Sequence, residues 1–398
     1  MQARPLGDGF FWVGAQDPDR RLFDNLIPLP HGTSYNAWVV RGSEGTVLVD
    51  AVEPHFGPVL FERLASIGAE PDFVVSNHAE QDHSGTLPEV MARFPRARLL
   101  TTPKGRDLLT LHLDLPVDRI RTVEDGETIS LGNRTLEFLH APWVHWPETM
   151  LTYVRELGLL LPCDLFGSHL STDQPWASRS GLVMEDARRY FATIMMPFTA
   201  QIRKHLARLE AWPCQVIAPS HGPVWDHPED ILEAYRYWVD GGPRNKVVIA
   251  WVSMHGSTQR MVEHLVDRLL ARDVDVEAFN LSAADLGRVA AATVDAATLV
   301  LGTPTVLGGA HPTALHAAMV LGALKPRIRH VAVIGSYAWG GRSTDQLAGL
   351  VSGLKAEVLD PVQVRGIPRS EDLAALDALA ETIARRHADL TLTPKENA

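Results

Sequence analysis

The stretch Ser76-Asn77-His78-Ala79-Glu80-Gln81-Asp82-His83-Ser84-Gly85 carries the strongest chemical signal in the first half of this chain. It directly follows a short apolar run, Phe73-Val74-Val75, so we place it on a loop that leaves the end of a strand. Two imidazoles and two carboxylates lie within six residues of this loop. Imidazole binds first-row transition metals well, and carboxylate favours harder ions. The loop therefore predicts a metal site, and it suits two metal ions better than one.

Further candidate ligands follow later predicted strands, which argues against a plain polar surface loop. Asp164 comes after the apolar run Gly158-Leu159-Leu160-Leu161-Pro162, and His221 follows the strand that begins at Gln215. His140 and His145 both come after a predicted hairpin and compete for one ligand position. Side chains at strand ends can converge on one point, so these residues extend the predicted metal site.

The spacing of these residues resembles the metallo-β-lactamase fold, whose usual signature is His-x-His-x-Asp-His. Glu80 stands where that signature has its second histidine. Together with the later ligands, this glutamate resembles the pattern of the flavodiiron protein family. The resemblance extends over nearly the whole chain, because a flavodoxin-like half follows.

The resemblance implies a ligand set for a non-haem diiron site. It selects His145, the histidine before Trp146-Pro147, over His140, and it makes Trp146 a wall of the metal pocket and our candidate catalytic residue. Asp164 would bridge the two irons. One iron would take His78, Glu80 and His145, and the other would take Asp82, His83 and His221.

Glu80 also bears on which metal is expected. Zinc has no redox chemistry, and hydrolytic relatives mostly use nitrogen-rich first sites. Replacing a histidine by Glu80 adds negative charge, which stabilises ferric iron more than ferrous iron. The alternative, a zinc-dependent hydrolase with an added flavin domain, is therefore disfavoured.

The pattern of apolar segments predicts two domains. Short strands, turns and helices over 56–68, 87–94, 104–111, 186–195 and 199–211 suggest an αββα sandwich, with the metal loops at one sheet edge. The turn Asp240-Gly241-Gly242-Pro243-Arg244 separates this pattern from the next one. We expect a metallo-β-lactamase-like diiron domain over residues 1–243 and a flavodoxin-like domain over 244–398.

The second half begins with a nearly continuous apolar strand, Lys246-Val247-Val248-Ile249-Ala250-Trp251-Val252, as in a sheet covered on both faces. A loop rich in hydroxyl groups follows, and a helix extends from it to about Leu270. Hydroxyl and backbone N–H groups at a helix N-terminus favour a phosphate, and Gly256 permits close approach. The loop resembles the phosphate loop of flavodoxins.

Two later loops also leave strand ends, where open α/β sheets bind ligands. They resemble the flavodoxin loops that enclose an isoalloxazine ring, with Trp339 as a candidate ring-stacking residue. Where family members often carry an aromatic residue and Asn, this chain has Val306-Leu307. We predict a doubly wound parallel sheet of five βα units that binds FMN, since no Gly-x-Gly-x-x-Gly fingerprint of a dinucleotide site follows a strand. The predicted FMN-binding residues are Ser253, Met254, His255, Gly256, Ser257, Thr258, Thr303, Pro304, Thr305, Val306, Leu307, Gly308, Ser336, Tyr337, Ala338, Trp339 and Gly340.

Composition and net charge limit the classes of partner that we expect this protein to bind. The 398 residues carry a formal net charge of −11, which argues against nucleic acid or an anionic membrane. No apolar run approaches the ~20 residues of a membrane span. The two cysteines, Cys163 and Cys214, form no disulfide framework and favour a cytoplasmic setting. An iron–sulfur module would need four thiolates, so electrons must come from an external donor: a rubredoxin, a flavoprotein reductase or a reduced deazaflavin.

The resemblance to flavodiiron proteins implies an oxidoreductase in which electrons pass through FMN to a diiron site that reduces dioxygen to water, or nitric oxide to nitrous oxide. The resemblance implies head-to-tail homodimers, or dimers of dimers. Many relatives place a histidine near Asp24, and this acidic replacement favours dioxygen as the main substrate. A main role as nitric oxide reductase is the alternative.

Overall fold

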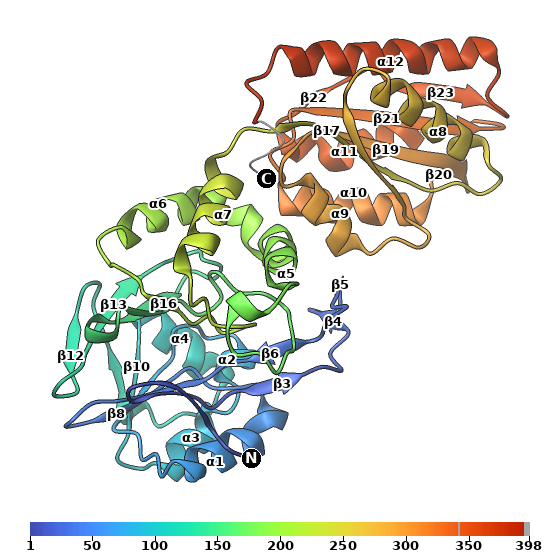
Figure 1. The fold of residues 1–398 in the computed structure, drawn as a ribbon. Coiled ribbons are helices and arrows are strands. Elements are labelled where there is room, and N and C mark those ends of the chain that lie inside the picture. Colours follow the sequence, from blue (N-terminus) through green and yellow to red (C-terminus); the bar gives the residue numbers. More distant parts are fainter. Residues whose placement is uncertain (341–342, 394–398) are drawn as a thin grey trace. The chain divides into compact units, whose positions relative to one another are not determined.

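The structure is a computed structural model that describes residues 1–340 and 343–393 (Figure 1). Contacts divide the chain into two units, which we describe separately. The first comprises Met1–Phe191 and Phe198–Arg236, and the second comprises Ala192–Pro197 and the chain from Tyr237 onward. The domain boundary after residue 243 stays a prediction. Within the described ranges, no helix combines the length and the apolar character that a membrane span requires.

The first unit contains two stacked sheets. The seven-stranded sheet has the order β1-β2-β7-β8-β9-β10-β11, and the five-stranded sheet has the order β12-β13-β14-β15-β16. The strands of the first are Arg4–Gly7, Phe10–Trp12, Trp38–Arg41, Thr46–Val49, Phe73–Val75, Arg98–Thr101 and Ile120–Thr122. Those of the second are Thr128–Ser130, Thr135–His140, Met150–Val154, Leu159–Leu161 and Val216–Ile217. Two short ribbons add β3 (Ala15–Asp17) with β6 (Thr33–Tyr35), and β4 (Leu22–Phe23) with β5 (Ile27–Pro28).

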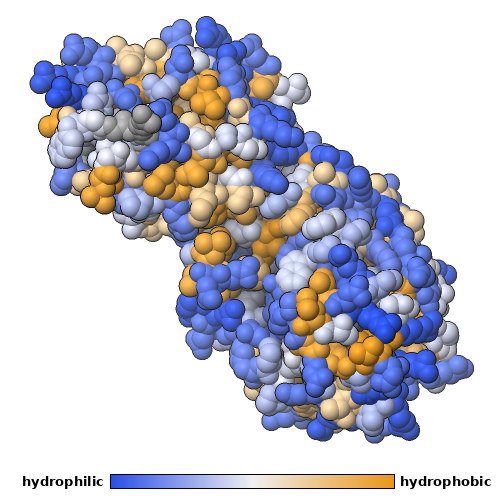
Figure 2. Space-filling model, turned by 180° about the vertical axis from the view of Figure 1, so that it is seen from behind, coloured by the Kyte–Doolittle hydropathy of each residue, from blue (hydrophilic) through white to orange (hydrophobic). Residues whose placement is uncertain are grey.

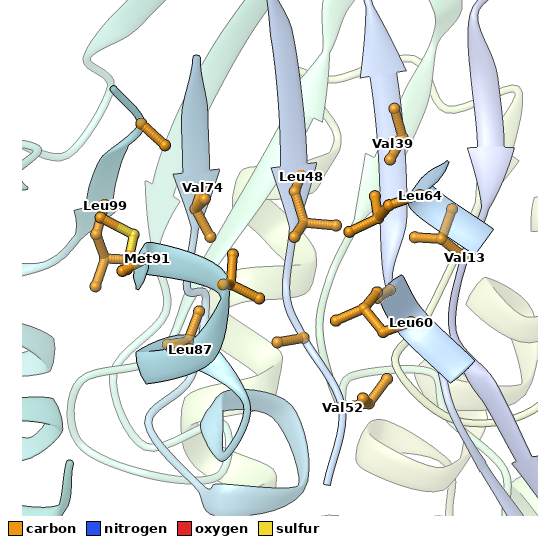
Figure 3. Close-up of a cluster of buried hydrophobic side chains, with 14 of the residues drawn as sticks. Val13, Val39, Leu48, Val52, Leu60, Leu64, Val74, Leu87, Met91 and Leu99 are labelled. Atoms are coloured by element: carbon orange, nitrogen blue, oxygen red, sulfur yellow. The ribbon is translucent and has the colours of Figure 1, made fainter. Parts of the chain in front are cut away.

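Successive side chains of the central strands of the larger sheet point to opposite faces, so each face contributes to a hydrophobic core of its own. Val39, Leu48 and Val74 point to the face covered by α1 (Gly57–Ser66) and α3 (Leu87–Arg93), where they meet Leu60 and Met91 (Figure 3). Their neighbours in sequence point the other way and pack against the second sheet; they include Trp38, Val40, Val47, Val49 and Val75.

The remaining helices of this unit complete the layers. Helix α4 (Pro103–His112) connects β10 to β11, and the short helix α2 (Gln81–Ser84) follows β9. Beyond the second sheet, Trp212 follows α6 (Thr199–Leu209) and stacks on Tyr153 of β14, with ring centroids 4.9 Å apart. In chain order, helix α5 (Val183–Tyr190) precedes α6, and helix α7 (Pro228–Asp240) follows β16. The αββα sandwich is confirmed.

Two local predictions differ from the structure. The segment His78–His83 is not all loop, because α2 forms a single helical turn within it. The helix predicted over 186–195 is α-helical only to Tyr190, and Phe191–Met195 continue as a π-helix. Strand β14 was not assigned from the sequence, because all five of its residues are buried and the period-2 signal is absent.

The second unit is an open sheet with the strand order β18-β17-β19-β21-β22, in which β23 also pairs with β21. All of these pairings are parallel, and the order is the flavodoxin-like form of the doubly wound fold. The strands are Arg244–Trp251 (β17), Asp275–Asn280 (β18), Ala296–Val306 (β19), His330–Tyr337 (β21), Glu357–Val358 (β22) and Val362–Arg365 (β23), with Gly309–Ala310 (β20) antiparallel to β19.

Helices cover both faces of this sheet, as the continuous apolar strands predict. Helices α8 (Ser257–Leu270) and α12 (Ser370–Ala388) pack on one face, where Leu265 and Leu376 meet Ile249 and Val300. The other face carries α9 (Leu286–Thr293), α10 (Pro312–Leu324) and α11 (Ser343–Val351) (Figure 1). Figure 2 shows that hydrophilic side chains cover most of the face it presents, with hydrophobic groups scattered among them.

Candidate functional site

The structure brings all seven predicted metal ligands together. They are supplied by the segment after β9, the turn between β13 and β14, and the segments after β15 and β16. The site therefore lies where strands of both sheets end, rather than at the edge of one sheet. Possible ligand atoms fall into two groups, each within 4.8 Å: His78, Glu80, His145 and Asp164 in one, and Asp82, His83 and His221 in the other.

Asp164 lies between the two groups. Its Oδ2 is 3.2 Å from His145 Nε2 and 3.5 Å from His78 Nε2. Its Oδ1 is 3.0 Å from His83 Nε2 and 3.4 Å from His221 Nε2. Each oxygen thus faces one pair of imidazoles, which is the arrangement that a bridging carboxylate requires.

Each pair of imidazoles also has a carboxylate of its own. Glu80 Oε2 lies 3.1 Å from His78 Nε2 and 3.3 Å from His145 Nε2. Asp82 places Oδ1 3.3 Å from His83 Nε2 and Oδ2 3.3 Å from His221 Nε2. Since every imidazole presents Nε2 toward carboxylate oxygens, the geometry provides two adjacent N/O sites.

The chemistry of these donors fits two bound cations. His83 Nε2, Asp82 Oδ1 and Asp164 Oδ1 are buried and have no hydrogen-bond partner among the described residues. Burial alone would lower the pKa of His78, but hydrogen bonds with Glu148 and Glu80 outweigh it and raise that pKa to about 10. Concentrated negative charge of this kind attracts protons when metal is absent. A first-row transition metal would satisfy the same groups.

Outer hydrogen bonds hold two of the imidazoles in place. Glu148 Oε1 accepts from His78 Nδ1 at 2.7 Å, and the Ser34 carbonyl accepts from His221 Nδ1 at 2.6 Å. Such partners fix the ring so that Nε2 faces the metal. Neither partner was predicted from the sequence. A carboxylate two residues after Trp146 was the available signal for Glu148, whereas a backbone carbonyl leaves no signal in sequence.

A pocket of about 320 Å³ opens beside the predicted ligands Glu80, Asp82 and His221. Its other lining residues include Asp24, Tyr35 and His169. His169 has no ligand spacing in the sequence, yet it is buried and its ring lies 4.9 Å from that of His221. Trp146 is not among the residues that line this pocket; its indole stands edge-on to His78, with ring centroids 4.9 Å apart.

In the second unit, a pocket of about 280 Å³ lies at the ends of β17, β19 and β21. Helix α8 begins beside it after Gly256, whose φ of +87° a residue with a side chain rarely adopts. Gly366 also lines the pocket and was missed, because the strand before it, β23, was not assigned from the sequence. The predicted residues that line it are Ser253, Met254, His255, Ser257, Pro304, Thr305, Ser336, Tyr337, Ala338 and Trp339.

The other predicted flavin residues lie around this pocket without lining it. Thr258 and Ser336 share a buried hydrogen bond of 3.0 Å, and Thr303 Oγ1 donates to the Pro304 carbonyl. The turn of Val306, Leu307 and Gly308 extends beyond the pocket, and the Leu307 side chain is 98% exposed. Gly340 follows Trp339 at the end of the third loop.

Comparisons with known proteins agree with this architecture. Residues 33–222 match the model of the ODP family beta lactamase. The chain is 36% identical over 394 residues to the nitric oxide reductase of Moorella thermoacetica, covering 96% of this chain and 98% of that protein.

Solved structures extend the likeness to the whole fold. The rubredoxin oxygen:oxidoreductase of Desulfovibrio gigas has a TM-score of 0.92 at 28% identity, covering 97% of this chain and 98% of that one. The flavodiiron protein of Giardia intestinalis has a TM-score of 0.93 at 27% identity, covering 98% of this chain and 97% of that one. With the paired ligand groups and the flavodoxin-like sheet, these likenesses show that this chain belongs to the flavodiiron protein family.

Proposed function

We propose that this protein is an oxidoreductase that passes electrons through FMN to two iron ions and there reduces dioxygen to water, with nitric oxide as a slower substrate. The observation that carries the proposal is the Asp164 carboxylate, each of whose oxygens faces one pair of imidazoles. Bound iron would supply the one-electron chemistry. Relatives named for nitric oxide and for rubredoxin and oxygen support the same reaction class.

The residues of the chain have separate roles in this proposal. Asp164 would hold both cations, one with each oxygen, and Glu148 and the Ser34 carbonyl fix the rings of His78 and His221. The pocket beside His221 admits a small molecule. Burial raises the pKa of Asp24, which helps this residue to hold a proton at the pocket.

Metal and flavin analysis tests the proposal. Protein made under iron-replete conditions is expected to contain about two irons per chain and to release FMN on acid treatment. Two zincs with no iron would contradict the diiron assignment and favour the zinc hydrolase. Released FAD, or a colourless protein that takes up no FMN, would contradict the flavin assignment.

Asp24 is our candidate for the preference between the two gases. Reduction of one dioxygen to water consumes four protons, whereas coupling two nitric oxides consumes two, so a proton-holding group at the pocket favours dioxygen. We expect Asp24→Asn, which removes the titratable group, to lower the ratio of kcat/KM for dioxygen to that for nitric oxide by about 10-fold. Asp19→Asn, which alters an aspartate whose side chain is 95% exposed, is the matched control. An unchanged ratio in Asp24→Asn would show that Asp24 does not set the preference between the gases.

We also propose that two chains associate head to tail, so that the flavin of one serves the irons of the other, in line with the prevalence of two-fold homo-oligomers. Complementation tests this assembly. Asp164→Ala impairs only the metal site and Ser257→Asp only the flavin site, so a mixed dimer keeps one intact pairing. Co-expression is expected to restore part of the turnover that each variant lacks. Full turnover by a protein that light scattering shows to be monomeric would contradict the proposal.

The electron donor is external to this chain. A rubredoxin, a flavoprotein reductase and a reduced deazaflavin remain the candidates, and comparison of their rates of FMN reduction distinguishes them. The cytoplasmic setting expected from the two cysteines stays a prediction; both are free thiols in the structure.

A further inference from the structure

The two halves of the metal site offer almost the same direct ligands. Each half has two imidazole nitrogens, one carboxylate of its own and one oxygen of the shared Asp164. Direct ligands of equal number and equal formal charge would leave two bound irons with similar preferences for an electron. Any large difference in reduction potential between the two irons must therefore come from the groups that contact the ligands from outside.

Those groups differ in charge. Behind His78 stands the carboxylate of Glu148, whose Oε1 accepts from His78 Nδ1 at 2.7 Å and from the Ala79 backbone N–H at 3.0 Å. Glu148 is only 3% exposed, and its Oε2 has no hydrogen-bond partner among the described residues. Its charge is thus neither solvated nor paired with an Arg or Lys in that part of the chain.

Behind the other half, no charged group accepts a hydrogen bond from a ligand imidazole among the described residues. The His221 Nδ1 donates to the Ser34 backbone carbonyl at 2.6 Å. The Nδ1 of His83 is buried without a hydrogen-bond partner among the residues described. The buried carboxylate of Asp50 accepts from the Asn77 backbone and side chain rather than from a ligand imidazole.

A charged acceptor on Nδ1 pulls the proton away from the ring and makes Nε2 a stronger donor to metal. The effect is large in a buried site, because a low dielectric weakens the field of the carboxylate less than water does. A more electron-rich set of ligands stabilises ferric iron over ferrous iron. The half that contains His78 should therefore be the harder one to reduce.

We propose that Glu148 sets the order in which the two irons accept electrons, so that the first electron from FMN resides in the half formed by Asp82, His83 and His221. Asp82 and His221 line the 320 Å³ pocket, and so does Glu80 of the other half. Two of the three ligands that belong to the first-reduced half alone thus border the pocket, against one of three in the other half. This inference rests on the proposed diiron function. Glu148 acts through His78 and is a positioning residue.

Glu148→Gln separates charge from shape. Both hydrogen bonds of Glu148 are accepted by one oxygen, so a glutamine carbonyl can accept both while the charge is lost. A potentiometric titration of the iron-loaded protein, followed by EPR of the one-electron-reduced state, is the measurement. We expect the lower of the two iron midpoint potentials to shift upward toward the higher one, so that the difference between them narrows. Less of the one-electron-reduced state then accumulates, and its maximum EPR signal falls. Asp50→Asn removes another buried carboxylate, one that interacts electrostatically with His83, and is expected not to narrow the difference.

Each outcome has a defined meaning. If the wild-type protein does not bind two irons, the proposed function is contradicted. The inference about Glu148, which depends on that function, then falls with it. The inference is overturned if Glu148→Gln binds two irons and the difference between their midpoint potentials is unchanged. It is also overturned if Asp50→Asn narrows that difference as much as Glu148→Gln does. If Glu148→Gln does not bind iron, Glu148→Asp replaces it, because this variant keeps the negative charge. Two bound irons with the wild-type difference between their midpoint potentials would support the inference. Loss of that difference despite the retained charge would overturn it.

Discussion

Asp164→Ala is expected to contain well under two irons per chain and to lose more than about 100-fold in turnover with dioxygen. The physical reason is the position of this carboxylate between two pairs of imidazoles, with each oxygen facing one pair. Loss of an outer-shell partner typically costs about 10- to 100-fold in metal affinity or activity, so loss of a shared direct ligand should cost more. Elemental analysis and oxygen-uptake rates measure the two effects.

Asp173→Ala is the matched control, because the same substitution there removes a carboxylate that is 94% exposed and forms an ion pair with Arg4. It should keep its iron and its turnover. Asp164→Ala with two irons and near-wild-type turnover would show that Asp164 is not a bridge. Absorbance of the bound flavin provides an internal check, since FMN content should be unaffected by either change.

Ser257→Asp is expected to weaken FMN binding by about 10- to 100-fold. Ser257 lines the flavin pocket and is the first residue of α8, where the backbone N–H groups of a helix N-terminus favour a phosphate. A carboxylate there would repel the phosphate dianion, at a cost of about 1–3 kcal/mol after solvent screening. Fluorescence titration of the apoprotein with FMN measures the change.

Ser257→Ala is the companion variant, because it removes the hydroxyl without adding charge and should cost only about 1 kcal/mol. Iron content should be the same in both variants, since the metal ligands all belong to the first unit. Equal affinities for FMN in Ser257→Asp and wild type would place the phosphate elsewhere.

The metal site was predictable because its ligands occupy strand ends. His78, Glu80, Asp82 and His83 follow one strand within six residues, and Asp164 and His221 each follow another. The alternation of Val39 with Val40, and of Leu48 with Val49, reflects the burial of both faces of the larger sheet. Spacing and periodicity of this kind are properties of a local segment, so the sequence reveals them directly.

The partners behind the ligands were not predictable in the same way. Glu148 is 70 residues from His78, and Ser34 is 187 residues from His221, so no spacing links them. His169 comes near His221 only through the packing of the folded chain. In the second unit, the three loops that we predicted to bind flavin all contribute to one pocket, but the sequence did not distinguish residues that line the pocket from those, such as Leu307, that are exposed to solvent.

The most direct test of the central claim is a single reoxidation. Fully reduced protein would hold two electrons on FMN and one on each iron, enough to reduce one dioxygen to two waters. When such protein is mixed anaerobically with limiting dioxygen in a stopped-flow instrument, we expect about one dioxygen consumed per chain, reoxidation of both flavin and iron, and no hydrogen peroxide. Peroxide formed in proportion to flavin reoxidation, with the iron spectrum unchanged, would contradict the account.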